Sequence, residues 1–211
     1  MKIEWVTVGP FQENSYLVTD EGSGRGVLID PGDEPARIIR MVRAADVEIE
    51  AVWLTHAHLD HLGAVAAVTR EWKVPVFLHQ SDLVLYRRAA SQAAFYGLEL
   101  EQPADPDRWL EDGNAVTVGA SRFTVRHTPG HSPGHVVFVS DTVMLGGDLL
   151  FAGSIGRTDL PFSSPEAMDA SLALVAGLDP EIVVYPGHGP PTSIGAELAT
   201  NPFLASARTS I

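Results

Sequence analysis

Short runs of hydrophobic residues recur along the chain, separated by turns rich in glycine, proline and aspartate. Runs of this length, bounded by turn residues, are typical of β-strands. They predict strands at residues 3–8, 15–19, 27–29, 51–54, 76–78, 115–118, 123–126, 136–139, 143–145 and 182–185. Hydrophobic residues spaced three and four apart predict helices between some of these strands. The helices are expected after a cap at Asp33, at 62–73, at 81–98 and from Ser163 or Ser164 to Gly177.

The order of these elements predicts an α/β protein. Strands come first in each half of the chain and helices alternate with strands afterwards, which places sheets in the middle and helices outside. No linker, low-complexity segment or sequence repeat divides the chain. Residues 1–211 are therefore expected to form a single domain.

The turn between strand 51–54 and helix 62–73 carries a dense group of potential metal ligands. It reads Thr-His-Ala-His-Leu-Asp-His and contains His56, His58, Asp60 and His61. Side chains two residues apart in an extended segment point the same way, so the first two histidines can reach one ion. The last two residues, past the bend, can face a second ion. The alternative is a capping aspartate beside surface histidines, but so many ligand side chains at one strand end favour a metal site.

Further polar residues follow other predicted strands in the same way. His131 and His188 each come after a Pro-Gly turn, and Asp148 comes after a pair of glycines that lets backbone pack closely. The chain has no cysteine, so a metal would have to be bound by nitrogen and oxygen, and disulfides are excluded. Together with the turn at 55–61, these residues indicate a metal centre built from strand ends. The remaining histidines, for which structural roles are expected, are His79, His127 and His135.

Composition narrows the possible partners. The chain has 27 acidic and 14 basic residues, a net charge of −13 and a hydrophobic content of 45%. Such a charge repels phosphate backbones and no cluster of lysine and arginine counters it, so nucleic-acid binding is not expected. No apolar run approaches the roughly 18 residues of a membrane span, and the N-terminal residues lack the apolar segment of a signal peptide. A cytoplasmic protein that acts on a small molecule, without membrane attachment, is expected.

These motifs resemble those of metallo-β-lactamase-fold hydrolases, and within that superfamily those of the glyoxalase II (hydroxyacylglutathione hydrolase) branch. The motifs that carry the resemblance are Leu28-Ile29-Asp30-Pro31-Gly32, the turn at 55–61, His131, Gly147-Asp148, Gly156-Arg157-Thr158-Asp159-Leu160-Pro161, Pro186-Gly187-His188 and Asn201-Pro202-Phe203-Leu204. The resemblance spans residues 15–204. It implies an αβ/βα sandwich, in which two mixed β-sheets pack face to face and are flanked by helices.

The resemblance also implies a site for two divalent ions and assigns its ligands. They are His56, His58 and His131 for one ion and Asp60, His61 and His188 for the other, with Asp148 bridging both and Asp30 bracing the ligand loop from behind. Neutral imidazoles and two carboxylates would leave a local charge of about +2, enough to hold a bridging hydroxide at neutral pH. Zinc suits such nitrogen and oxygen ligands best, and iron or manganese would also fit.

The implied activity is hydrolysis of a thioester of the hydroxyacylglutathione type. The hydroxide would attack the carbonyl, one ion would stabilise the oxyanion, and Asp60 would orient the nucleophile. A thiolate leaving group, with a thiol pKa of roughly 8.5, needs little help from an acid. Full glyoxalase II proteins carry an added C-terminal helical domain that grips glutathione. So few residues follow His188 that this domain is expected to be missing and glutathione to be held less tightly.

Other interpretations are compatible with parts of the pattern. A persulfide dioxygenase would use a single iron held by His56, His131 and Asp148, although residues 156–161 favour the hydrolase. A true β-lactamase is disfavoured because the cysteine common there at the second ion has no counterpart. A non-catalytic metal-binding module is disfavoured by the complete ligand set. Arg157 is a candidate for holding a substrate carboxylate, unless it pairs internally with an aspartate.

Overall fold

Two stacked β-sheets form from the alternating hydrophobic residues of the predicted strands. In this computed structural model, which describes residues 1–208, each sheet has six strands. The order in the first sheet is β1 (Lys2–Val8), β2 (Glu13–Asp20), β3 (Arg25–Ile29), β4 (Glu48–Trp53), β5 (Val76–His79) and β6 (Arg108–Leu110). The order in the second sheet is β14 (Thr192–Ser193), β13 (Val183–Pro186), β10 (Val143–Gly147), β9 (Val136–Val139), β8 (Ser121–His127) and β7 (Ala115–Val118).

Both sheets are mixed. In the first sheet β1, β2 and β3 are antiparallel, whereas β3, β4, β5 and β6 run parallel to one another. In the second sheet β10 and β13 are parallel and the other neighbours are antiparallel. A separate short hairpin consists of β11 (Leu150–Phe151) and β12 (Ser154–Ile155). The predicted fold of two mixed sheets is confirmed.

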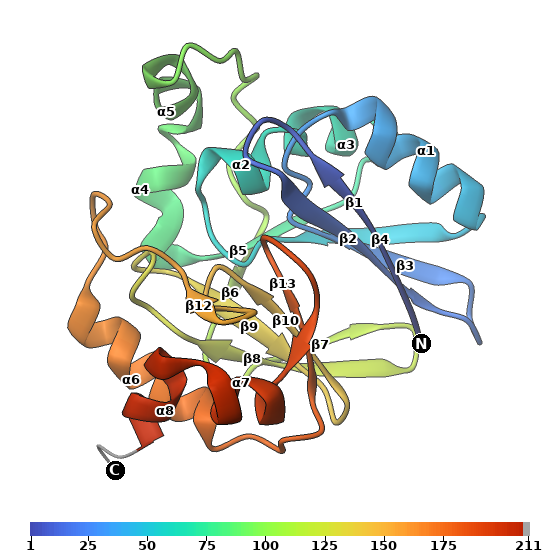
Figure 1. Cartoon of the computed structure of the whole chain (residues 1–211). Helices are drawn as coiled ribbons and strands as arrows, with labels where there is room; N and C mark the ends of the chain where they lie inside the picture. The colour runs from blue at the N-terminus through green and yellow to red at the C-terminus, as the bar shows by residue number, and fades with distance from the viewer. Residues whose placement is uncertain (209–211) are drawn as a thin grey trace.

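Helices cover the outer faces of both sheets (Figure 1). Against the first sheet lie α1 (Pro35–Ala45) and α3 (Val65–Trp72), and against the second lie α6 (Pro165–Ala176), α7 (Ile194–Thr200) and α8 (Pro202–Arg208). Shorter helical segments at the loop end are α2 (Leu59–Leu62), the 3₁₀ turn η1 (Gln80–Asp82), α4 (Leu83–Tyr86) and α5 (Ala89–Phe95). None of the helices within the described residues is long and apolar enough to cross a membrane.

The side chains of each strand divide between different hydrophobic layers because they alternate across the sheet. In β2, Tyr16 and Val18 face the second sheet, whereas Leu17 packs toward α1 and α3. Trp53 lies at the centre of the layer between the sheets, with its ring centroid 5.9 Å from Phe123 and 5.2 Å from Phe138. These side chains are almost fully buried, and burial of each contributes about 1.5–3 kcal/mol. The resulting layers hold the strand ends rigidly.

Strand direction brings distant segments to one edge of the sandwich. The parallel strands β3, β4 and β5 all end at this edge, and so do β10 and β13 of the second sheet. The two sheets are linked there, because Asn14 N of the first sheet donates a hydrogen bond to Gly187 O at 2.8 Å. Within the second sheet, Gly187 N donates to Gly147 O at 2.8 Å. Residues that follow these strands therefore meet in a small volume.

Some of the predicted elements differ from those observed. The helix predicted at 62–73 is interrupted between α2 and α3, where Ala64 N donates a hydrogen bond to Pro31 O at 2.9 Å instead of bonding within the helix. The backbone packs so closely there that a Cβ on Gly63 would lie only 2.3 Å from Gly32 O. The helix predicted at 81–98 consists of η1, α4 and α5. Asp33 does not cap α1; the N-cap residue is Glu34, which has a left-handed backbone with a φ of 47°. Short strands at residues 108–110 and 192–193 and the C-terminal helices were not predicted.

Candidate metal centre

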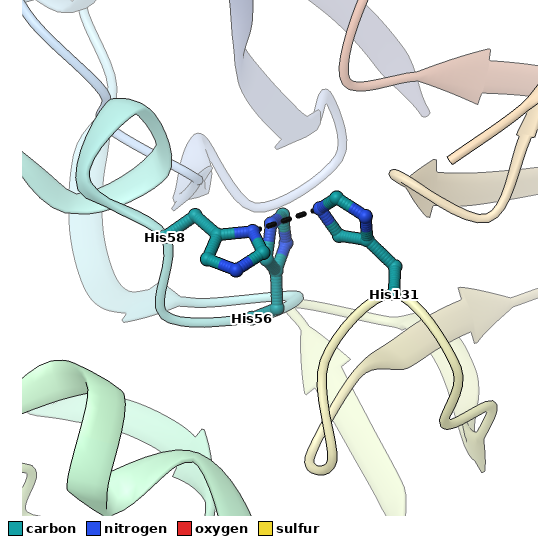
Figure 2. Close-up of side chains that lie close together, drawn as sticks. All are labelled: His56, His58 and His131. Carbon is teal, nitrogen blue, oxygen red and sulfur yellow. Dashed lines mark hydrogen bonds between the residues drawn. The ribbon is translucent and has the colours of Figure 1, made fainter. Parts of the chain in front are cut away.

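The turn that follows β4 directs its first two histidines at a third histidine from the other sheet. His56 and His58 extend from this turn, and His131 extends from the loop that follows β8, so that the rings converge (Figure 2). His58 Nδ1 lies 2.8 Å from His131 Nε2. One ring nitrogen from each of the three residues lies within 4.8 Å of the others. The structure therefore brings together the ligands predicted for the first ion.

Asp30 holds two of the histidines from behind. Its carboxylate accepts hydrogen bonds from Thr55 N at 2.7 Å, from Thr55 Oγ1 at 2.6 Å and from His61 Nδ1 at 3.0 Å. Since the Thr55 hydroxyl donates to Asp30, the 3.0 Å contact between Thr55 Oγ1 and His56 Nδ1 requires a proton on that ring nitrogen. Both rings thus carry a proton on Nδ1, so Nε2 is the nitrogen that faces the ligand groups. Asp30 occupies the bracing position that was predicted for it.

A second group lies beside the first. It consists of Asp60, His61 and His188, with ligand atoms within 4.8 Å of one another. His188 Nε2 is 3.4 Å from Asp60 Oδ2, and His61 Nε2 is 3.9 Å from the same oxygen. The ligands predicted for the second ion are therefore also adjacent.

Asp148 stands between the two groups. Its Oδ1 is 3.3 Å from His61 Nε2, and its Oδ2 is 3.4 Å from both His131 Nε2 and His188 Nε2. The neighbouring glycines allow this approach, since a Cβ on Gly187 would lie 2.2 Å from Asp148 Oδ1. The carboxylate thus faces histidines from both groups, as a bridging ligand must.

Two observations show that these side chains suit a metal centre: some of their buried polar atoms lack hydrogen-bond partners, and the distances between their ligand atoms match those around a metal ion. His56 Nε2, His61 Nε2 and Asp148 Oδ1 are buried and have no hydrogen-bond partner within the described residues. Buried polar atoms rarely lack a partner, because such atoms cost free energy. Ligand atoms around one tetrahedral zinc, each bound at about 2.0–2.2 Å, lie about 3.3 Å apart, which is the spacing around Asp148. Asp30 also lies near His56 and His61, but it contacts the Nδ1 side of these rings, directly at His61 and through the Thr55 hydroxyl at His56.

The charges in the second group favour a cation. Burial lowers the pKa of His188, but hydrogen bonds to Asp148 and Asp60 outweigh it and raise the pKa to about 9. Burial likewise opposes protonation of His61, yet Asp148 and Asp60 raise its pKa well above the usual value. His56 differs, because burial lowers its pKa well below the usual range and leaves it neutral. Protonated histidines therefore occupy positions where a divalent ion would replace their protons.

Asp82 is a residue of this site that sequence reasoning missed. It is fully buried in η1, and its Oδ2 accepts hydrogen bonds from Ala57 N and Ser132 Oγ, both at 2.8 Å, while its Oδ1 accepts one from Gly134 N. Ala57 lies between two ligand histidines and Ser132 adjoins His131, so one carboxylate ties both ligand loops together. The available signal was its position just after β5, a strand parallel to β4.

The remaining histidines have structural contacts. His135 Nε2 accepts a hydrogen bond from Asp148 N at 3.0 Å, and its Nδ1 lies 3.0 Å from Thr128 Oγ1. Since Nε2 is thereby used, His135 positions the backbone of the bridging residue. His79 and His127 stack on each other with their ring centroids 4.1 Å apart, outside the ligand groups.

A cavity of about 720 Å³ opens above the ligand groups. Its floor includes His58, Asp60, His131, Asp148 and His188, and its walls include the aromatic rings of Phe11, Phe95, Tyr96, Phe151 and Phe162. Arg157 lines it too, but its guanidinium pairs with Asp159 at 2.8 and 3.0 Å. The internal pair considered from the sequence is therefore present. The Arg157 carbonyl accepts a hydrogen bond from His131 Nδ1 at 2.8 Å, so its backbone orients a ligand.

The helix-covered sandwich with a His/Asp metal-binding cluster at one edge defines the class of protein. The family model described as the metallo-β-lactamase superfamily matches residues 8–188. The chain belongs to the metallo-β-lactamase superfamily.

Relatives with similar sequences match almost the whole chain. The hydroxyacylglutathione hydrolase GloC of Haemophilus influenzae is 36% identical, over 98% of this chain and 99% of its own. The probable metallo-hydrolase YqgX of Bacillus subtilis is 35% identical, over 97% of this chain and 98% of its own. The family resemblance inferred from the motifs is thus confirmed.

Solved structures of several kinds share the fold. The protein TTHA1623, in a di-iron-bound form, is 47% identical with a TM-score of 0.88, over 95% of this chain and 99% of its own. BLEG-1, a B3 metallo-β-lactamase, is 35% identical with a TM-score of 0.90, over 96% of this chain and 99% of its own. ETHE1 from Myxococcus xanthus is 27% identical with a TM-score of 0.83, over 98% of this chain and 85% of its own.

Proposed function

We propose that this protein is a metal-dependent thioester hydrolase with two divalent ions, acting on a substrate of the hydroxyacylglutathione type. The observation that carries the proposal is the position of Asp148, within 3.3–3.4 Å of His61, His131 and His188. A carboxylate that faces both ligand groups at this spacing suits a pair of adjacent ions. The similarity to GloC supports the choice of substrate.

The ligand residues would hold the ions as described above, and zinc, iron or manganese suits their nitrogen and oxygen atoms. When bound, such ions lower the pKa of a water molecule and polarise a carbonyl oxygen. Asp60 lines the cavity and keeps a partly exposed carboxylate, which can accept a hydrogen bond from the attacking water and so orient it. The hydrogen bonds that His61 donates to Asp30 and His131 donates to the Arg157 carbonyl keep the imidazoles in position, so little reorganisation is needed during the reaction.

The leaving group explains why the cavity needs no strong acid. A thiol has a pKa of roughly 8.5, so the thiolate departs without a proton at neutral pH. The aromatic walls of the cavity limit access of bulk water to the reacting carbonyl. Within the described chain the cavity supplies a carboxylate to orient water and apolar walls to shield the thioester, which matches this chemistry.

The direct test is thioester hydrolysis by the purified protein. S-D-lactoylglutathione should be hydrolysed, the activity should be lost after treatment with a chelator, and zinc, iron or manganese should restore it. A β-lactam serves as the comparison substrate, because BLEG-1 shares the fold at 35% identity. If the metal-loaded protein opens the β-lactam but leaves every thioester intact, the proposal is wrong.

Persulfide dioxygenase activity, the alternative considered from the sequence, is the second candidate, because the ligands that it requires are also adjacent. That reaction would use one iron held by His56, His131 and Asp148. The contacts of His188 with Asp60 and Asp148 favour the hydrolase, since they complete a second group of ligands. Oxygen uptake with glutathione persulfide after iron loading distinguishes the two, and negligible uptake is expected.

A further inference from the structure

One face of the segment that begins α5 lines the cavity opposite the hairpin β11–β12. Its residues are Arg88, Ser91, Gln92 and Phe95, at the i, i+3, i+4 and i+7 spacing that places side chains on the same side of a helix. The α4–α5 segment rises above the edge of the first sheet, at the end where the ligand loops lie (Figure 1). A cation, a hydroxyl, an amide and a ring are thus presented together to the space above the ligands.

Arg88 differs from the other arginines near the cavity because it has no partner. Within residues 1–208 its guanidinium forms no ion pair and no hydrogen bond. Arg87, its neighbour in sequence, pairs with Asp105 and does not line the cavity. Arg157, which also lines the cavity, pairs with Asp159. In a chain with a net charge of −13, an arginine left unpaired beside a cavity is available for an anionic ligand.

The surrounding groups match a peptide-like molecule. Gln92 Nε2 donates a hydrogen bond to Leu85 O at 2.8 Å, which leaves its Oε1 to accept a hydrogen bond from a ligand N–H. Phe95 is 85% exposed. The ring of Tyr96 packs edge-on against the ring of Phe11, with the ring centroids 5.5 Å apart. Exposed rings beside a cavity gain free energy when a ligand covers them. A carboxylate, an amide N–H and methylene groups on one molecule would use all of these features.

We propose that Arg88 binds a carboxylate of the thiol half of the substrate, with Gln92 accepting from an amide and Phe95 and Tyr96 covering the peptide chain. This inference rests on the proposed function and names the part of the substrate that the α5 face recognises. The reacting carbonyl must reach the buried floor, so the longer thiol half extends to the rim where Arg88 lies. A guanidinium matches a carboxylate through two parallel hydrogen bonds. A single arginine among neutral groups suits this single negative charge.

The test measures binding without turnover. S-Methylglutathione is titrated by calorimetry into the metal-loaded protein, into Arg88→Ala and into Arg87→Ala as the matched control. We expect the affinity for S-methylglutathione to fall about tenfold or more in Arg88→Ala, as for loss of a charged hydrogen bond, and to stay unchanged in Arg87→Ala. The diethyl ester of S-methylglutathione should bind wild type as weakly as the acid binds Arg88→Ala, and Arg88→Lys should recover part of the affinity. Equal effects of both alanine variants, or equal binding of acid and ester by wild type, would overturn the inference.

Kinetics separate this inference from the proposed function. With S-D-lactoylglutathione, Arg88→Ala should raise KM about tenfold and leave kcat nearly unchanged, whereas a neutral N-acetylcysteamine thioester should show no change in KM. If no thioester is hydrolysed by wild type but S-methylglutathione binding depends on Arg88, the proposed function fails and the subsite stands. If thioesters are hydrolysed but wild type does not bind S-methylglutathione, the subsite fails and the function stands.

Discussion

The floor and the α5 wall of the cavity are built in opposite ways. On the floor, His56 is fully buried and Asp30, Thr55 and Asp82 hold the loops through short hydrogen bonds. On the wall, Phe95 is largely exposed and its neighbours come from helices of one or two turns. A catalytic centre needs ligands fixed in advance, whereas a surface that recognises substrate can be built on segments with few buried contacts.

This contrast suggests how members of one superfamily differ in activity. BLEG-1 and ETHE1 share the fold with this chain at TM-scores of 0.90 and 0.83. Changing residues on the floor would disturb several loops at once, because Asp82 and Asp148 each contact more than one of them. Changing residues of α5 would alter the wall while the floor keeps its hydrogen bonds.

The largest effect is expected when a floor ligand is removed. His131→Ala should reduce thioester hydrolysis by about a thousandfold or more, because it removes a ligand predicted for the first ion. It should also lower the melting temperature of the metal-loaded protein, since bound metal stabilises the native state. A thioesterase assay and thermal unfolding measure these two effects, and elemental analysis measures the metal content. Phe95→Ala is the control from the wall and should retain metal content and melting temperature; equal loss of metal in both variants would remove the contrast.

The second ligand group is tested by His188→Ala. This variant should bind about one ion per chain and lose on the order of a hundredfold in thioesterase activity, as expected for loss of a catalytic electrostatic group. It leaves His56, His58 and His131 in place, so the first ion should stay bound. Metal content after dialysis and kcat are the measurements. Full thioesterase activity with one ion would contradict the role of the second ligand group. Brisk oxygen uptake with glutathione persulfide that survives the substitution would favour the dioxygenase instead.

Asp82 tests whether the floor depends on residues that touch neither metal nor substrate. Asp82→Asn replaces one acceptor oxygen by a donor that faces Ala57 N, Ser132 Oγ or Gly134 N. We expect metal affinity to fall about 10–100-fold, as for other partners of metal ligands, and stability to fall by about 1–3 kcal/mol. Asp107→Asn, which alters a carboxylate that accepts from Val76 N, is the control and should keep wild-type metal affinity. Equal metal affinity in the two variants would mean that Asp82 only stabilises the fold.

Most of the floor could be predicted from the sequence because its signals are local. The hydrophobic runs locate the strands, and ligand residues stand within a few positions of their ends, as at His56 and Asp148. Parallel strands then bring these ends to the same edge, so no knowledge of individual contacts is needed. The break in the predicted helix 62–73 was missed for the opposite reason, because it depends on a hydrogen bond between Ala64 and Pro31.

The wall and the supporting carboxylate depend on contacts between distant residues. Arg87 and Arg88 are identical in type and adjacent in sequence, yet one pairs with Asp105 and the other lines the cavity. Asp82 lies within a stretch predicted as part of helix 81–98, which gave no reason to place its carboxylate between two loops. Such roles follow from which residues meet in the folded chain, which periodicity does not reveal.

The smallest effect is expected for Arg157→Ala. The Arg157 guanidinium is exposed and already paired with Asp159, and exposed ion pairs contribute little to stability. The carbonyl that orients His131 belongs to the backbone and is kept in the variant, so kcat should be preserved. We therefore expect KM for S-D-lactoylglutathione to change by no more than about threefold, in contrast to Arg88→Ala measured in parallel. A rise above about tenfold that is absent with a neutral thioester would place the carboxylate on the β11–β12 side of the cavity and contradict the assignment to Arg88.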